Sequence, residues 1–131
     1  MSRIMVLVCI LASIFFVDAK AQKEVEIKLW AELWGPTGRV SRAEVFRARN
    51  DTLFVFEHNS YTLGLSSVGA SFCSLVSPAI VKPVRTNFNR TPEVLPGHPL
   101  YPASGEALVF TFECGNDAQE PVRQSIVIAS R

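Results

Sequence analysis

The fold is decided by a short run of alternating residues, EVEIKLWAELW at positions 24–34. Its odd-numbered positions from Val25 to Leu33 are all apolar, whereas its even-numbered positions carry glutamate, lysine and tryptophan. Successive side chains of a strand point to opposite faces of a sheet, so this alternation creates one apolar face and one polar face. The run therefore predicts a half-buried β-strand, although an amphipathic helix is the competing interpretation.

Similar signals along the rest of the chain predict an all-β domain. Turn sequences occur at GPTG (35–38) and at Asn50–Asp51. Stretches rich in aromatic and β-branched residues predict further strands at TLFVFE (52–57), YTLGL (61–65), ASFCSLV (70–76), EALVFTFEC (106–114) and VRQSIVIA (122–129). About six to eight short strands separated by glycine and proline turns are typical of a β-sandwich.

One long segment interrupts these strands. Six of the eight prolines lie between Pro78 and Pro102. Proline lacks the N–H that a sheet ladder needs, so this segment is excluded from the sheet centre and is expected to be a long surface loop. Loops of this length in compact domains commonly carry function, and His98 and Tyr101 within it are candidates for a contact surface.

The first residues have the pattern of a secretory signal peptide. Arg3 precedes an unbroken apolar stretch, and the sequence Ala19–Lys20–Ala21 has the small residues of a cleavage site. A membrane anchor is the weaker alternative, because a span needs about 20 apolar residues and Asp18 ends this stretch too early. We therefore expect a signal peptide at residues 1–21 and one secreted domain at residues 22–131, without a membrane span.

The charge balance of the expected secreted domain is neutral. Cleavage removes Arg3, Lys20 and Asp18, so that 13 basic and 12 acidic residues become 11 of each. A neutral surface gives no electrostatic reason to bind nucleic acid. The nearest approach to a basic patch is a group of four arginines interrupted by Glu44, for which a solvated face is favoured over a polyanion site: Arg39, Arg42, Arg47 and Arg49.

Two cysteines remain after the expected cleavage, Cys73 and Cys114. An even pair in a secreted domain predicts a disulfide, here expected to join one sheet of the sandwich to the other. The alternative is that Cys114 is a free thiolate that binds a metal. That alternative leaves Cys73 unpaired in an oxidising compartment, so the disulfide is favoured.

Two segments resemble the cupredoxins, and most closely the plant-type phytocyanins. The first is FRARNDTLFVFEHN…VGASFCS (46–74), with an Asp-Thr-Leu motif, a hydrophobic strand, a His-Asn pair and a cysteine. The second is GEALVFTFECGNDAQEPVRQSIVIAS (105–130), with an aromatic strand that ends in cysteine, a loop, a glutamine and a closing strand. The resemblance implies a cupredoxin-like Greek-key β-sandwich.

The resemblance also implies where copper ligands would lie. His58, Cys114 and Gln124 match the family's upstream histidine, loop cysteine and axial glutamine, but Gln119 occupies the position of the loop histidine. Type 1 copper uses two imidazoles and a thiolate, and a carboxamide is a poor substitute. A functional copper site and any other cofactor are therefore not expected, and the three residues are kept only as copper candidates.

Other candidate sites are few. Trp30 and Trp34 fall on the polar face of the first strand and would offer a stacking surface if exposed, although burial is the commoner fate of tryptophan. Asn50 and Asn89 begin the sequons NDT and NRT and are possible glycosylation sites. No motif for nucleophilic catalysis is present in the sequence.

These features favour a secreted, non-catalytic extracellular binding or matrix protein whose partner is a protein, a carbohydrate or a matrix component. One alternative is a small extracellular copper protein for electron transfer. Another is a secreted enzyme, or an enzyme inhibitor, that acts through the proline-rich loop.

Overall fold

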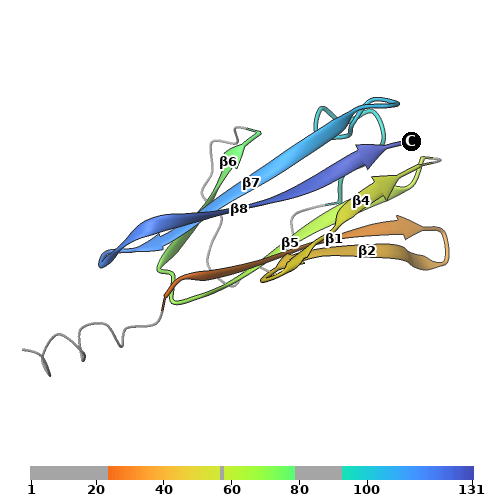
Figure 1. The fold of residues 1–131 in the computed structure, drawn as a ribbon. Helices are drawn as coiled ribbons and strands as arrows, with labels where there is room; N and C mark the ends of the chain where they lie inside the picture. Colours follow the sequence, from red (N-terminus) through yellow and green to blue (C-terminus); the bar gives the residue numbers. More distant parts are fainter. Residues whose placement is uncertain (1–23, 57, 79–92) are drawn as a thin grey trace, which may run out of the picture.

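The computed structural model describes residues 24–56, 58–78 and 93–131, which form two four-stranded sheets. The sheets lie in two layers, with β7 and β8 in one and β1 and β2 in the other (Figure 1). The strands are β1 (Glu26–Gly35), β2 (Gly38–Phe46), β3 (Arg49–Asn50), β4 (Thr52–Val55), β5 (Ser60–Val68), β6 (Phe72–Ser77), β7 (Ala107–Asn116) and β8 (Gln119–Ser130). The predicted all-β sandwich is confirmed.

The first sheet has the order β3-β2-β1-β5. β1 and β2 form a hairpin whose turn ends at Gly38, where a φ of 130° is readily adopted only by glycine. β5 then returns to lie antiparallel beside β1. Three consecutive strands with a fourth beside the first are a Greek-key arrangement.

The chain changes sheets at Asp51. β3 pairs with β2, whereas β4, which begins one residue after Asp51, runs parallel to β8 in the second sheet. The Asp51 amide donates to the Glu44 carbonyl at 3.0 Å, and the Asp51 carboxylate accepts from the Glu44 amide at 3.1 Å. The predicted position of the turn, Asn50–Asp51, is wrong. The chain reverses at Arg47–Ala48, and Asp51 is the point where it crosses from the first sheet to the second.

The second sheet has the order β4-β8-β7-β6 and contains the disulfide. The predicted bond between Cys73 and Cys114 is confirmed. The prediction that it joins the two sheets is wrong, because Cys73 of β6 lies directly opposite Cys114 of the neighbouring strand β7. The bond therefore clamps two adjacent strands of one sheet, with both cysteines fully buried.

The core lies between the sheets and confirms the predicted alternation. All five odd-numbered residues from Val25 to Leu33 are buried there, opposite apolar side chains of β7 and β8 such as Phe110, Phe112, Ile126 and Ile128. The face of β8 that carries Val122, Gln124, Ile126 and Ile128 is buried only in its second half. Val122 is 40% exposed and Gln124 is half-buried, so the core opens toward the beginning of that strand.

The segment 93–106 packs against the beginning of β5. Val94 bridges Tyr61 through two backbone hydrogen bonds, and the Tyr61 hydroxyl donates to the Leu100 carbonyl. The expected signal peptide, Asn89 and much of the proline-rich loop lie outside the described residues. Within the described residues, no helix has the length and apolar character to span a bilayer.

Candidate binding cleft

Trp30, the first residue predicted for a contact surface, packs against residues of its own sheet. It lies on the outer face of β1, opposite Gly64 of β5. A Cβ atom placed on Gly64 would come within 1.9 Å of Trp30 Cε2, so the indole rests directly on the glycine backbone. The Arg42 guanidinium lies 5.4 Å from the ring centroid. The indole therefore contacts β5 through Gly64 and also contacts the Arg42 guanidinium.

Trp34 is also engaged by its neighbours. Its indole N–H donates to the hydroxyl of Thr62 at 2.9 Å, and Thr62 is buried although it belongs to the outer face. Together, the two indoles cover the outer side of β5. Both indoles are half-buried, so part of each ring faces solvent, and a stacking surface at these tryptophans stays a prediction.

The two loop residues predicted for contact have different roles. His98 is exposed, and its Nδ1 accepts a hydrogen bond from the Leu100 amide at 3.1 Å. Tyr101 is half-buried, packs its ring 5.9 Å from that of Tyr61 and donates its hydroxyl to the Asn59 carbonyl at 2.8 Å. Tyr101 therefore fixes the loop to the start of β5, and only His98 of the pair faces solvent.

The three copper candidates do not meet. His58 is an exposed turn residue with a φ of 62°, placed just after β4. β4 ends beside Ser130, whereas Cys114 pairs with Val122 at the opposite end of β8. Eight residues of strand separate these points by roughly 26 Å. In the described residues, no group of three or more histidines, cysteines and carboxylates is arranged for a metal ion.

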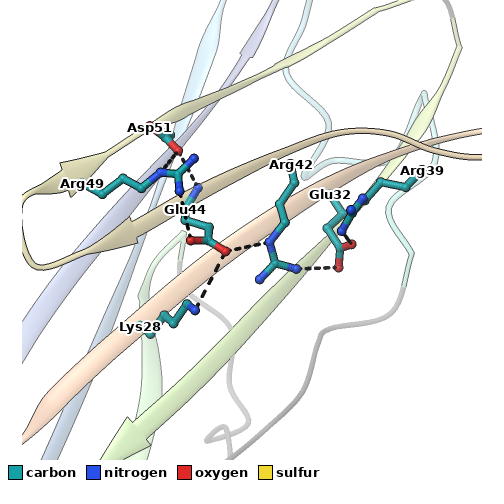
Figure 2. A network of polar contacts seen from close by, with 7 residues as sticks. All are labelled: Lys28, Glu32, Arg39, Arg42, Glu44, Arg49 and Asp51. Carbon is teal, nitrogen blue, oxygen red and sulfur yellow. Dashed lines mark hydrogen bonds and ion pairs between the residues drawn. The ribbon is translucent and has the colours of Figure 1, made fainter.

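The outer face of the first sheet carries a network of alternating charges (Figure 2). Arg42 lies between two carboxylates, donating from Nε to Glu44 at 2.9 Å and approaching Glu32 at 3.7 Å. Arg39 pairs with Glu32 at 3.2 Å, and Lys28 lies 3.9 Å from Glu44. The solvated face predicted for these arginines is therefore correct for Arg39 and Arg42, whose charges are matched locally.

Of the other two arginines of that sequence group, Arg49 remains in this network through Glu44, at 3.5 Å (Figure 2). Arg47 and Arg49, in and after the β2–β3 turn, line an open cleft of about 450 Å³ between this turn and β8. Arg123 of β8 lines it from the other side. We call this site the arginine cleft, lined by Arg47, Arg49, Asn50, Arg123, Gln124 and Ser125. Among the described residues, its lining contains three guanidinium groups and no carboxylate.

The fold itself creates this cleft. β4 covers the edge of β8 only from Val127 to Ser130, because the chain leaves the first sheet at Asp51. The preceding part of β8 has β7 as its ladder partner and no described strand on its other side. Pro121 and Arg123 stand on this part, residue types that discourage pairing with another strand. The cleft occupies the space left open beside that edge.

Carboxylates outside the cleft orient two of its arginines. Arg49 donates from Nε to Asp51 at 2.7 Å, and Arg123 donates from Nε to Glu113 at 2.8 Å. The Glu44 amide, followed by Arg49, holds the pKa of Asp51 below its usual value. Arg49 also donates from Nη1 to Glu44 at 3.5 Å. Each guanidinium has five N–H donors, so Arg49 keeps its second Nη group, and Arg123 keeps both of its Nη groups, for a ligand.

Arg47 is the least neutralised arginine of the cleft. It is exposed, has a φ of 56° and lies over the Phe46 ring at 4.9 Å. It forms no ion pair with the described carboxylates, unlike Arg49 and Arg123. Arg47 therefore supplies the charge in this lining that no described carboxylate offsets, and it is the group best placed to pair with an anion.

The sequons have separate outcomes. Asn50 is exposed and lines the arginine cleft, whereas Asn89 lies outside the described residues.

A scan of protein-family models, a search of curated proteins and a search of solved structures each found no match to the chain. The cupredoxin resemblance therefore stays a prediction.

Proposed function

We propose that this is a secreted, non-catalytic extracellular binding protein whose ligand carries anionic groups and binds in the arginine cleft. The observation that carries this proposal is the lining itself, where Arg47, Arg49 and Arg123 gather around one cleft without a carboxylate among the described residues. Guanidinium groups match sulfate, phosphate and carboxylate oxygens in two-point hydrogen bonds. Gln124 and Ser125 add neutral donors and acceptors to the same wall.

The carboxylates that orient Arg49 and Arg123 support this proposal. An arginine side chain loses rotamer entropy when a ligand fixes it. The ion pairs of Arg49 with Asp51 and of Arg123 with Glu113 already order these side chains in part, so less entropy is lost on binding. The expected secreted domain has a net charge of zero, so its surface as a whole exerts no general attraction on polyanions. Selective binding of an acidic ligand, rather than general adhesion to any polyanion, is the result expected of such a surface.

The proposal is tested with an array of neutral, carboxylated and sulfated glycans and matrix proteins. We expect the secreted protein to bind acidic members, and the double variant Arg47→Gln/Arg123→Gln to lose that binding. Arg131→Gln is the matched control, because this exposed arginine packs on Phe54 at the far end of β8. Binding to neutral members alone, or unchanged binding by the double variant, would contradict the proposal.

A further inference from the structure

We infer that the ligand is an anionic polysaccharide, held as an extended chain that runs out of the arginine cleft into a neighbouring hollow; this inference rests on the proposed function. The hollow has a volume of about 210 Å³. It is named the Phe46 hollow and is lined by Glu26, Ile27, Phe46, Arg47 and Gln124. Arg47 and Gln124 line both spaces, so the two are neighbours on the surface.

The dimensions favour a chain over a compact ion. Sites of about 300–1,000 Å³ accept ligands of the size of a drug molecule or a short oligosaccharide. The arginine cleft alone is within that range, and the hollow extends it. A single sulfate or phosphate would contact one side of such a cleft and leave the other guanidinium groups in water.

The exposure of the arginines leads to the same conclusion. The side chains of Arg49 and Arg123 are 60% and 63% exposed, so each ion pair is screened by solvent. An exposed ion pair contributes little to binding, so three such pairs alone fall short of millimolar affinity. A chain with several linked anionic groups gains further contacts without a new loss of translational entropy for each.

The Phe46 hollow limits where the charges of that chain can be. Ile27 and Phe46 supply apolar surface and Gln124 supplies an amide, whereas Glu26 and Arg47 bring one charge of each sign to the wall. The hollow therefore has no net charge that would attract an anionic group. We expect the segment in the hollow to be uncharged, as a sugar ring with hydroxyl groups is, and the anionic groups to lie in the arginine cleft, where Arg47, Arg49 and Arg123 line the wall.

This distribution of charge distinguishes a polysaccharide from a nucleic acid. A single-stranded nucleic acid carries a phosphate at each nucleotide and would place one near Glu26. In a polysaccharide, sulfate or carboxylate groups alternate with neutral rings. Both sulfated chains and uronic-acid chains share this chemistry, and the experiment separates the two.

The test is a calorimetric titration of the whole secreted protein with sulfated and with uronic-acid oligosaccharides of increasing length. Inorganic sulfate and a single-stranded oligonucleotide are titrated in parallel. We expect affinity to rise at least tenfold from the disaccharide to the length that fills both spaces, in the sulfated series, the uronic-acid series or both. The series that shows the rise identifies the anionic group.

The variant Glu26→Gln probes the hollow separately. We expect it to raise the affinity for the oligonucleotide severalfold more than the affinity for the alternately charged oligosaccharide. Equal affinity for inorganic sulfate and for the longest oligosaccharides would contradict a polysaccharide ligand but not the proposal that the cleft binds anions. Tighter binding of the oligonucleotide than of both series would replace the polysaccharide with a nucleic acid. Oligosaccharide binding that survives in Arg47→Gln/Arg123→Gln would overturn both proposals.

Discussion

The packing of Trp30 on Gly64 makes a single added methyl group informative. In Gly64→Ala, the new Cβ would lie 1.9 Å from Trp30 Cε2 and 2.2 Å from Nε1, where ordinary contacts are about 3.5–4 Å. The indole must therefore move outward by roughly 1.5–2 Å, a distance that follows from those contact lengths. Such a shift separates the ring from β5 and disturbs its contact with Arg42.

The expected cost follows from two opposing effects. Overpacking of this kind costs about 1–3 kcal/mol. Replacing glycine by alanine restricts the unfolded chain and returns about 0.4–1 kcal/mol. The net loss is about 1–2 kcal/mol, which lowers the midpoint of thermal unfolding by roughly 4–8 °C in a domain of this size.

The assay combines thermal unfolding with tryptophan fluorescence, since the chain has two tryptophans. We expect Gly64→Ala to lower the midpoint and shift the emission to longer wavelength as water reaches the ring. Ser66→Ala, two residues along the same face of β5, is the control and should change neither. Wild-type stability and emission in Gly64→Ala would refute the packing of Trp30 on Gly64 and would mean that this face of the indole is open to a ligand.

Three further predictions concern stability. Removing the disulfide in Cys73→Ala/Cys114→Ala, whose cysteines are 41 residues apart, should cost up to about 4 kcal/mol in urea unfolding, and an unchanged midpoint would contradict this. The pKa of Glu44 is lowered mainly by its hydrogen bond from Arg42, and the pKa of Asp51 mainly by its hydrogen bond from the Glu44 amide. Both ionised carboxylates therefore stabilise the fold when the pH is above their ordinary pKa values of 4.5 and 3.8. That contribution should decline as pH falls below these values, and Glu44→Gln should show a shallower decline; equal slopes would count against it. Burial raises the pKa of both Tyr61 and Tyr101, so the folded protein should show little phenolate absorbance near pH 10, where free tyrosine is about half ionised. Phenolate should instead appear together with alkaline unfolding, and ordinary titration of the folded protein would be inconsistent with the buried hydroxyls.

Local patterns were enough to predict the strands and their buried faces. The alternation from Val25 to Leu33 identified β1 and its core side, because burial of one face leaves a period of two in the sequence. The pairing of Cys73 with Cys114 followed from their being the two cysteines of the expected secreted domain. Its position within one sheet did not follow, because that depends on β6 lying beside β7, a matter of topology that no local pattern records.

The arginine cleft could be predicted only in part. Arg47 and Arg49 were noticed as members of a basic group, but Arg123 lies more than 70 residues away along the chain. These residues meet because the chain crosses sheets at Asp51 and leaves the first half of β8 open. Asp51 was interpreted as an ordinary turn residue, since a short polar side chain favours a turn and a strand crossing alike. Gln124, a polar residue among the apolar residues that alternate from Val122 to Ile128, was the one sequence signal of an opening there.

The most direct test of the arginine cleft is the salt dependence of the dissociation constant for an acidic oligosaccharide, measured for wild type, Arg47→Gln and Arg131→Gln. The slope of affinity against salt concentration on logarithmic axes reports the number of ion pairs formed on binding. We expect a wild-type slope equivalent to about two or three ion pairs, a slope smaller by about one in Arg47→Gln, and an unchanged slope in Arg131→Gln. A dissociation constant that does not respond to salt, or an equal slope in all three proteins, would contradict binding in the arginine cleft.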